Sequence, residues 1–129
     1  MGDERGPSAP ATLAARPAIE AYGNGGFRVA GARVDGALLV CARGAWPWPA
    51  SSLAEATAAS LQAMLDADPA IELLLLGCGP GMAAVPASLR EELRARGIRV
   101  EGMATGAACR TFNVLMGENR RVAAALLPA

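Results

Sequence analysis

Short apolar runs and apolar–polar alternations, broken by glycine, occupy residues 18–42. Such runs bounded by turn residues are typical of strands. The expected strands are 19–22, 27–29, 33–34 and 38–40. Between them, residues 23–26 read Gly-Asn-Gly-Gly, and Asp35-Gly36 is a strong hairpin dipeptide. The pattern predicts an N-terminal antiparallel hairpin region in which neighbouring strands pair.

The second half of the chain alternates strand and helix patterns. Residues 71–76 are apolar at every position but one, which is typical of a central strand covered on both faces. Pro86 opens a helix that runs to about residue 96, and Gly97 stands at the usual C-cap position. Residues 98–103 form the next strand, so this unit predicts two adjacent parallel strands joined by a helical crossover.

Two more helices and a last strand complete the expected elements. Ser51 or Ser52 caps a helix that ends near Asp66, after a stiff proline loop at 44–49. Thr105 caps a third helix, and the chain then turns into a strand at 121–127. The buried stripe of the third helix is Ala108, Phe112, Leu115 and Met116. Because little chain precedes the last strand, we expect it to lie antiparallel in the sheet.

These elements predict an α/β fold in which helices cover a mixed sheet and an antiparallel hairpin region comes first. The proline-containing residues 1–16 are expected to be a disordered leader, and residues 17–129 to form a single domain.

Composition excludes several kinds of chemistry. Twelve arginines balance twelve acidic residues, so the chain lacks the charge that nucleic acids or anionic membranes attract. It has no histidine, the commonest general base and metal ligand. Cys41, Cys78 and Cys109 have the spacing of neither a disulfide framework nor a zinc site. The longest apolar run is too short to cross a bilayer. These features predict a protein of the reducing bacterial cytoplasm, without metal, cofactor or membrane insertion.

A glycine loop, residues 77–81, follows the central strand at the place where open α/β sheets bind ligands. Its backbone amides could cradle an anion, or the glycines could serve only a turn with positive φ. Met82 stands where a dinucleotide-binding fingerprint needs glycine, and the chain has no lysine for a P-loop.

The start of the third helix supplies the other half of this candidate cleft. Cys109 lies in the first turn, where the helix dipole favours a thiolate. Arg110 and Asn113 share a face and could bind a carboxylate or phosphate. The candidate ligand-binding residues are Gly77, Cys78, Gly79, Thr105, Cys109, Arg110 and Asn113. In the alternative interpretation Cys109 packs in the core, Arg110 pairs with Glu101 or Glu118, and Asn113 bonds to backbone.

Several segments together resemble one known family. They are 73–79 (LLLLGCG), 97–98 (GI), 103–115 (MATGAACRTFNVL) and 120–126 (RRVAAAL). Over residues 18–127 the chain is similar to the Mth-domain family of unknown function, which includes a mitochondrial complex I assembly factor. The resemblance implies three layers and a five-stranded mixed sheet with one antiparallel strand. That family commonly has threonine at the position of Cys78 and tyrosine at that of Phe112.

The sequence therefore favours a non-enzymatic, assembly-factor-like module that presents its cleft and the loop of Trp46 and Trp48 to a protein partner. The alternative is a small-molecule binder or enzyme in which Arg110, Asn113 and the 77–81 amides hold an anion. A third hypothesis of function is thiol redox chemistry through Cys78 and Cys109. No catalytic residue is predicted, and the expected state is a monomer or weak homo-oligomer.

Overall fold

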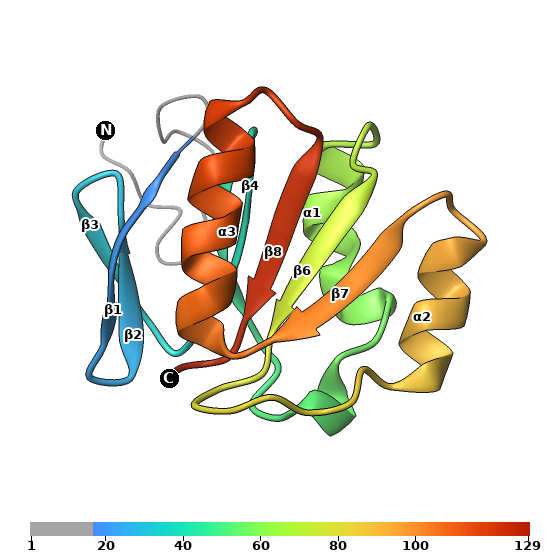
Figure 1. The fold of residues 1–129 in the computed structure, drawn as a ribbon, viewed down its shortest axis with the longest axis horizontal. Helices are drawn as coiled ribbons and strands as arrows, with labels where there is room; N and C mark the ends of the chain where they lie inside the picture. The colour runs from blue at the N-terminus through green and yellow to red at the C-terminus, as the bar shows by residue number, and fades with distance from the viewer. Residues whose placement is uncertain (1–16) are drawn as a thin grey trace.

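A five-stranded mixed sheet forms the middle layer of the protein (Figure 1). The computed structural model describes residues 17–129, so the leader expected at 1–16 lies outside the described residues. The strand order is β5-β4-β8-β6-β7. The strands are β4 (Ala37–Cys41), β5 (Gly44–Trp48), β6 (Leu73–Gly77), β7 (Arg99–Met103) and β8 (Val122–Leu126). Strands β6, β7 and β8 are mutually parallel, and β4 is antiparallel to both of its neighbours.

Helices cover both faces of this sheet. Helices α1 (Gln62–Ala67) and α2 (Ala87–Arg94) pack on one face, and α3 (Thr105–Gly117) packs on the other (Figure 1). Because strand side chains alternate, Leu39 joins the core under α1 and α2, whereas Leu38 joins the core under α3. The predicted three-layer α/β architecture is confirmed.

A second, three-stranded antiparallel sheet lies beside α3. Its strands are β1 (Ile19–Gly23), β2 (Gly26–Val29) and β3 (Ala32–Asp35). The turn at Asn24-Gly25 was predicted, but the turn at Ala30-Gly31 was not, because alanine seldom adopts the φ of +49° found here. Asp35-Gly36 was wrongly predicted as a hairpin. It is a corner at which the chain passes from the small sheet to the large one.

The predicted tryptophan loop is in fact strand β5. Pro47 is tolerated there because β5 is an edge strand, where a missing N–H leaves the sheet intact. The side chain of Trp48 is buried, and its Nε1–H donates to Ser60 Oγ at 3.0 Å. Trp48 therefore anchors the sheet edge to the following segment and is not presented to a partner.

The long helix expected from Ser51 to Asp66 is broken into two 3₁₀ turns, Leu53–Glu55 and Ala59–Leu61, followed by α1. The side chain of Thr57 accepts from Ser60 N, and that of Ser60 accepts from Thr57 N. Such local side-chain bonds compete with a continuous helix.

The last strand was predicted to be antiparallel, but β8 is parallel to β6. Helix α3 has 13 residues, which corresponds to about 20 Å of rise. It is therefore long enough to carry the chain from the end of β7 back to the start of β8. The single antiparallel strand of the sheet is β4.

Candidate functional site

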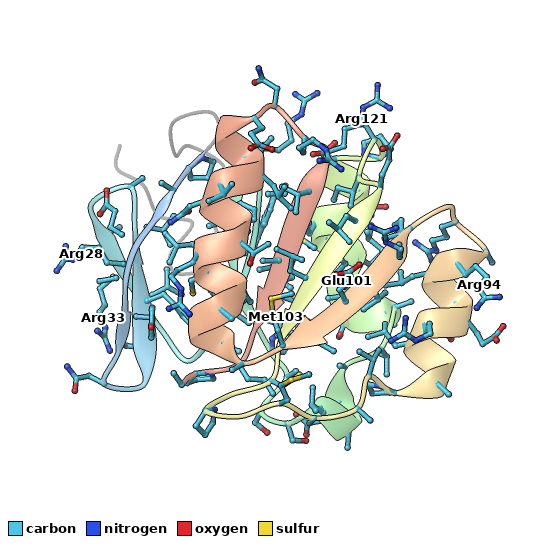
Figure 2. All side chains as sticks on the ribbon, in the orientation of Figure 1. Arg28, Arg33, Arg94, Glu101, Met103 and Arg121 are labelled. Atoms are coloured by element: carbon cyan, nitrogen blue, oxygen red, sulfur yellow. The ribbon has the colours of Figure 1, made fainter. Side chains whose placement is uncertain are left out.

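The carboxyl ends of β6 and β7 lie side by side, as predicted, with Gly77 opposite Met103. The labelled Met103 in Figure 2 marks this end of the sheet, next to the start of α3. The loop after β6 and the first turn of α3 meet here. Their polar groups decide whether the junction can hold a ligand.

Thr105 ties three segments together at this junction. Its buried hydroxyl donates to Leu127 O at 2.6 Å and accepts from Gly79 N at 2.9 Å. Its backbone N–H donates to Gly79 O at 2.8 Å. Thr105 was predicted to cap α3, but the N-cap is Ala104, and the hydroxyl bonds to the loop and to the chain beyond β8 instead.

The glycine loop is a structural turn. Gly79 has a φ of +93°. A Cβ on Gly77 would lie 2.7 Å from a Leu126 methyl and 3.0 Å from the Thr105 hydroxyl. Cys78 N donates to Met103 O at 2.8 Å, so the amides of Cys78, Gly79 and Thr105 are all used inside the protein. The loop amides of Cys78 and Gly79 are therefore not free to bind an anion, which favours the alternative interpretation of the glycine loop as a turn with positive φ.

The two cysteines expected to share the cleft lie on opposite faces of the sheet. Cys78 packs against the core under α1 and α2, whereas Cys109 is buried in the core under α3. Together with Cys41 they are free thiols. Burial raises the pKa of Cys109 to about 11, outweighing the opposite effect of the neighbouring Arg110 charge. The alternative interpretation, in which Cys109 packs in the core, is therefore the one that the structure supports.

The side chain of Asn113 forms hydrogen bonds to the backbone of the same chain. Its side-chain Oδ1 accepts from Ile19 N and its Nδ2 donates to Ile19 O, each at 2.9 Å. This pair fixes the start of β1 to α3. The alternative interpretation, in which Asn113 bonds to backbone, is the one that the structure confirms.

Arg110 is the remaining candidate, and it is exposed. Within residues 17–129 its guanidinium has no ion pair or hydrogen bond, and Glu101 pairs with Arg99 instead. Tyr22 lies beside it: a Cβ on Gly106 would be 2.6 Å from Tyr22 Oη and 3.5 Å from Arg110 Nη1. Sequence reasoning missed Tyr22 because it comes from β1, far away in the chain.

The marked surface hollows lie elsewhere, along the free edge of β7 and the amino ends of β6 and β8. One hollow, of about 440 Å³, lies between α2 and β7 and is lined by Arg90, Arg94 and Arg99. A second, of about 220 Å³, and a third, of about 400 Å³, share Arg120 and Arg121. In the sequence, this surface could have been suspected only from the adjacent pair Arg120-Arg121.

Two further properties concern the described residues as a whole. No three histidine, cysteine or acidic side chains of residues 17–129 gather in a way that could hold a metal ion. None of the helices in this part of the chain has the length and apolar character needed to cross a bilayer.

Known proteins resemble this chain in sequence over nearly its whole length. Residues 19–127 match the family model described as "Protein of unknown function (DUF498/DUF598)". An uncharacterised Rhodobacter capsulatus protein is 43% identical over 122 residues, which are 95% of this chain and 92% of that protein. The zebrafish NADH dehydrogenase [ubiquinone] 1 alpha subcomplex assembly factor 3 is 38% identical over 85% of this chain. The chain spans only 63% of that factor's length.

Solved structures share the fold. A Bartonella henselae protein, titled an outer membrane protein, has a TM-score of 0.81 and 37% identity, covering 90% of this chain and 98% of its own. A Bordetella pertussis protein titled a Mth938-like domain has a TM-score of 0.74 and 31% identity, covering 99% and 92%. The resemblance noted from the sequence motifs is confirmed.

Proposed function

Because the chain belongs to the family of unknown function DUF498/DUF598 and has assembly factors among its relatives, we propose that it is a non-enzymatic assembly factor. In this role it binds a protein subunit during construction of a larger complex. The relatives' name points to a subunit of an NADH dehydrogenase as the partner. The proposed location is the cytoplasm, and the proposed state is a monomer or weak homo-oligomer.

The observation that carries the non-enzymatic part is the internal use of the polar groups at the predicted cleft. The hydroxyl of Thr105 and the amide of Asn113 bond to backbone atoms of the same chain. The thiol of Cys109 is buried and held protonated by a pKa of about 11. These groups stabilise the fold, and a catalytic group would need to reach a substrate.

One observation favours the alternative, a protein that binds a small anion. The guanidinium of Arg110 is exposed beside the Tyr22 hydroxyl, and both groups can donate to a carboxylate or phosphate. This arrangement retains Arg110 from the predicted site but replaces the loop amides and Asn113 with Tyr22.

Deletion of the gene in its native host tests the proposal. We expect less fully assembled NADH dehydrogenase on native gels, restored by the wild-type gene and equally by an Arg110→Ala gene. Chemical cross-linking of the tagged full chain, followed by mass spectrometry, should identify a subunit of that enzyme. Unchanged assembly together with no cross-linked subunit would refute the assembly role. Restoration by wild type but not by Arg110→Ala would favour the anion-binding alternative.

A further inference from the structure

Six arginines form a continuous belt on one side of the protein. The belt consists of Arg43, Arg90, Arg94, Arg99, Arg120 and Arg121, which line the three hollows described above. Arg99 lines both the first and the second hollow, and Arg120 and Arg121 line both the second and the third. The shared side chains make the three hollows neighbours along one path.

The belt carries more positive than negative charge, although the chain as a whole is neutral. The acidic residues that line the same three hollows are Asp68 and Glu72. Glu72 is occupied by Arg121, at 2.9 Å. The side chains of Arg43, Arg94 and Arg120 are exposed and have neither an ion pair nor a hydrogen bond within residues 17–129. Half of the belt is thus available to an external anion.

The distribution of the free arginines indicates the shape of that anion. Arg94 lines the first hollow, Arg120 the second and third, and Arg43 the third. A compact ligand such as phosphate is held by donors that converge on one point. Here the donors are spread along a path, from α2 past the amino ends of the central strands to the residues between β4 and β5. Such a path suits an extended chain that carries several carboxylates.

We propose that this arginine belt binds an extended acidic segment of the partner protein. The inference rests on the proposed function and specifies which surface of the protein the partner contacts. Arginine is enriched at the residues that dominate protein interfaces, because its planar fork can pair with carboxylates in two-point contacts. Complementary charge also guides the partner to this side of the molecule.

A labelled octaglutamate peptide is a direct probe of the belt. Its binding to the full chain is followed by fluorescence anisotropy at low and at physiological ionic strength. Arg94→Glu and Arg43→Glu alter opposite ends of the belt, and neither side chain has a partner to lose. Arg28→Glu is the charge control: it makes the same charge change on the small sheet, where Figure 2 shows Arg28 on the side away from Arg94 and Arg121. Unlike the belt variants, it also removes an exposed hydrogen bond, from Arg28 Nη1 to Gly31 O at 3.2 Å.

We expect each belt variant to weaken octaglutamate binding by about threefold to tenfold, since an exposed attraction is replaced by a repulsion. The Arg28→Glu control should change the affinity for octaglutamate by less than about twofold, because it alters the overall charge of the protein but not the belt. Equal weakening by the control, or sensitivity at one end only, would overturn the extended belt. Arg43→Gln and Arg94→Gln repeat the test without added negative charge, and thermal unfolding verifies that every variant is folded.

The cross-linking experiment above separates the two proposals. If the NADH dehydrogenase subunit is captured equally by wild type and by the Arg43→Glu/Arg94→Glu variant, the belt assignment fails while the assembly role stands. If octaglutamate binding depends on the belt, but gene deletion leaves enzyme assembly intact and no subunit is cross-linked, the assembly role fails while the acidic-segment site stands.

Discussion

The side chain of Asn113 in α3 pairs with both backbone polar groups of Ile19, 94 residues away in the chain, through two hydrogen bonds of 2.9 Å. The side-chain amide thus pairs with the backbone of β1 as a residue of a neighbouring strand would. This pairing joins the small sheet to α3. Because Ile19 is also buried in the core under α3, polar and apolar contacts fix the same residue.

Asn113→Ala should lower the free energy of unfolding by about 1–3 kcal/mol, because it leaves the Ile19 N–H and carbonyl without partners. Urea denaturation measures the loss, and amide hydrogen exchange should show β1 opening more often than β6. Val114→Ala is the control next to it, since Val114 is 59% exposed and a change there should cost less than about 0.5 kcal/mol. A stable Asn113→Ala protein with unaltered exchange in β1 would contradict this role.

Thr105→Val keeps the shape of the side chain but removes the hydroxyl that Gly79 N and Leu127 O both use. We expect a loss of about 2 kcal/mol or more, since two buried backbone groups lose their partner. Thr105→Ser retains the hydroxyl and should lose clearly less. Urea denaturation of both variants measures the difference, and equal stability of the two would show that the hydroxyl contributes little.

Burial also predicts how stability depends on pH. The pKa of Cys41 and that of Cys109 are each raised from 9.0 to about 11 by burial. The folded state therefore holds these protons more tightly than the unfolded chain does. This contribution to stability is complete below pH 9 and is lost as the pH rises from about 9 to 11, by up to about 1.4 kcal/mol per pH unit for each thiol.

Urea denaturation between pH 7 and 11 measures this loss. The Cys41→Ala/Cys109→Ala variant should show a shallower decline over pH 9–11, whatever its stability at pH 7. In native protein at pH 7, iodoacetamide should label the partly exposed Cys78 well before the buried Cys109. Fast labelling of Cys109 would contradict its raised pKa.

Arg110→Ala should leave stability unchanged or raise it by a few tenths of a kcal/mol. The guanidinium has no partner within residues 17–129, and a cation in the first turns of a helix opposes the helix dipole. Thermal and urea unfolding measure the effect, with Arg121→Ala as a comparison that loses an ion pair to Glu72. A loss of more than about 1 kcal/mol in Arg110→Ala would reveal a structural role.

The parallel strand–helix–strand unit and the buried stripe of α3 could be predicted because their signals are local. Periodic apolar residues mark the elements, and Gly97, with a φ of +80°, lies in the turn that follows the end of α2 at Arg94. The direction of β8 could not be predicted in this way. It depends on how far the 13 residues of α3 carry the chain back along the sheet, which no local signal in β8 itself indicates.

The candidate site was harder to predict because its residues act through distant partners. Threonine at a helix start usually caps the helix, yet the Thr105 hydroxyl donates to the carbonyl oxygen of Leu127, 22 residues away. The sequence around Asn113 contains nothing that indicates Ile19. Proximity at the carboxyl ends of β6 and β7 was predicted correctly, but the use of the polar groups there depends on the packing of the whole domain.

Both edge strands of the large sheet, β7 and β5, are poorly suited to pair with an additional strand. On one margin, Arg90 Nη1 donates to Val100 O in β7 at 3.0 Å, and Val85 lies so close to Gly102 that an added Cβ would be 2.8 Å away. On the other margin, β5 contains Pro47, which has no N–H to offer. An edge with its hydrogen-bonding groups occupied or missing is a poor template for another strand. We therefore expect concentrated solutions of the protein to withstand fibril formation, although the chain is rich in apolar residues.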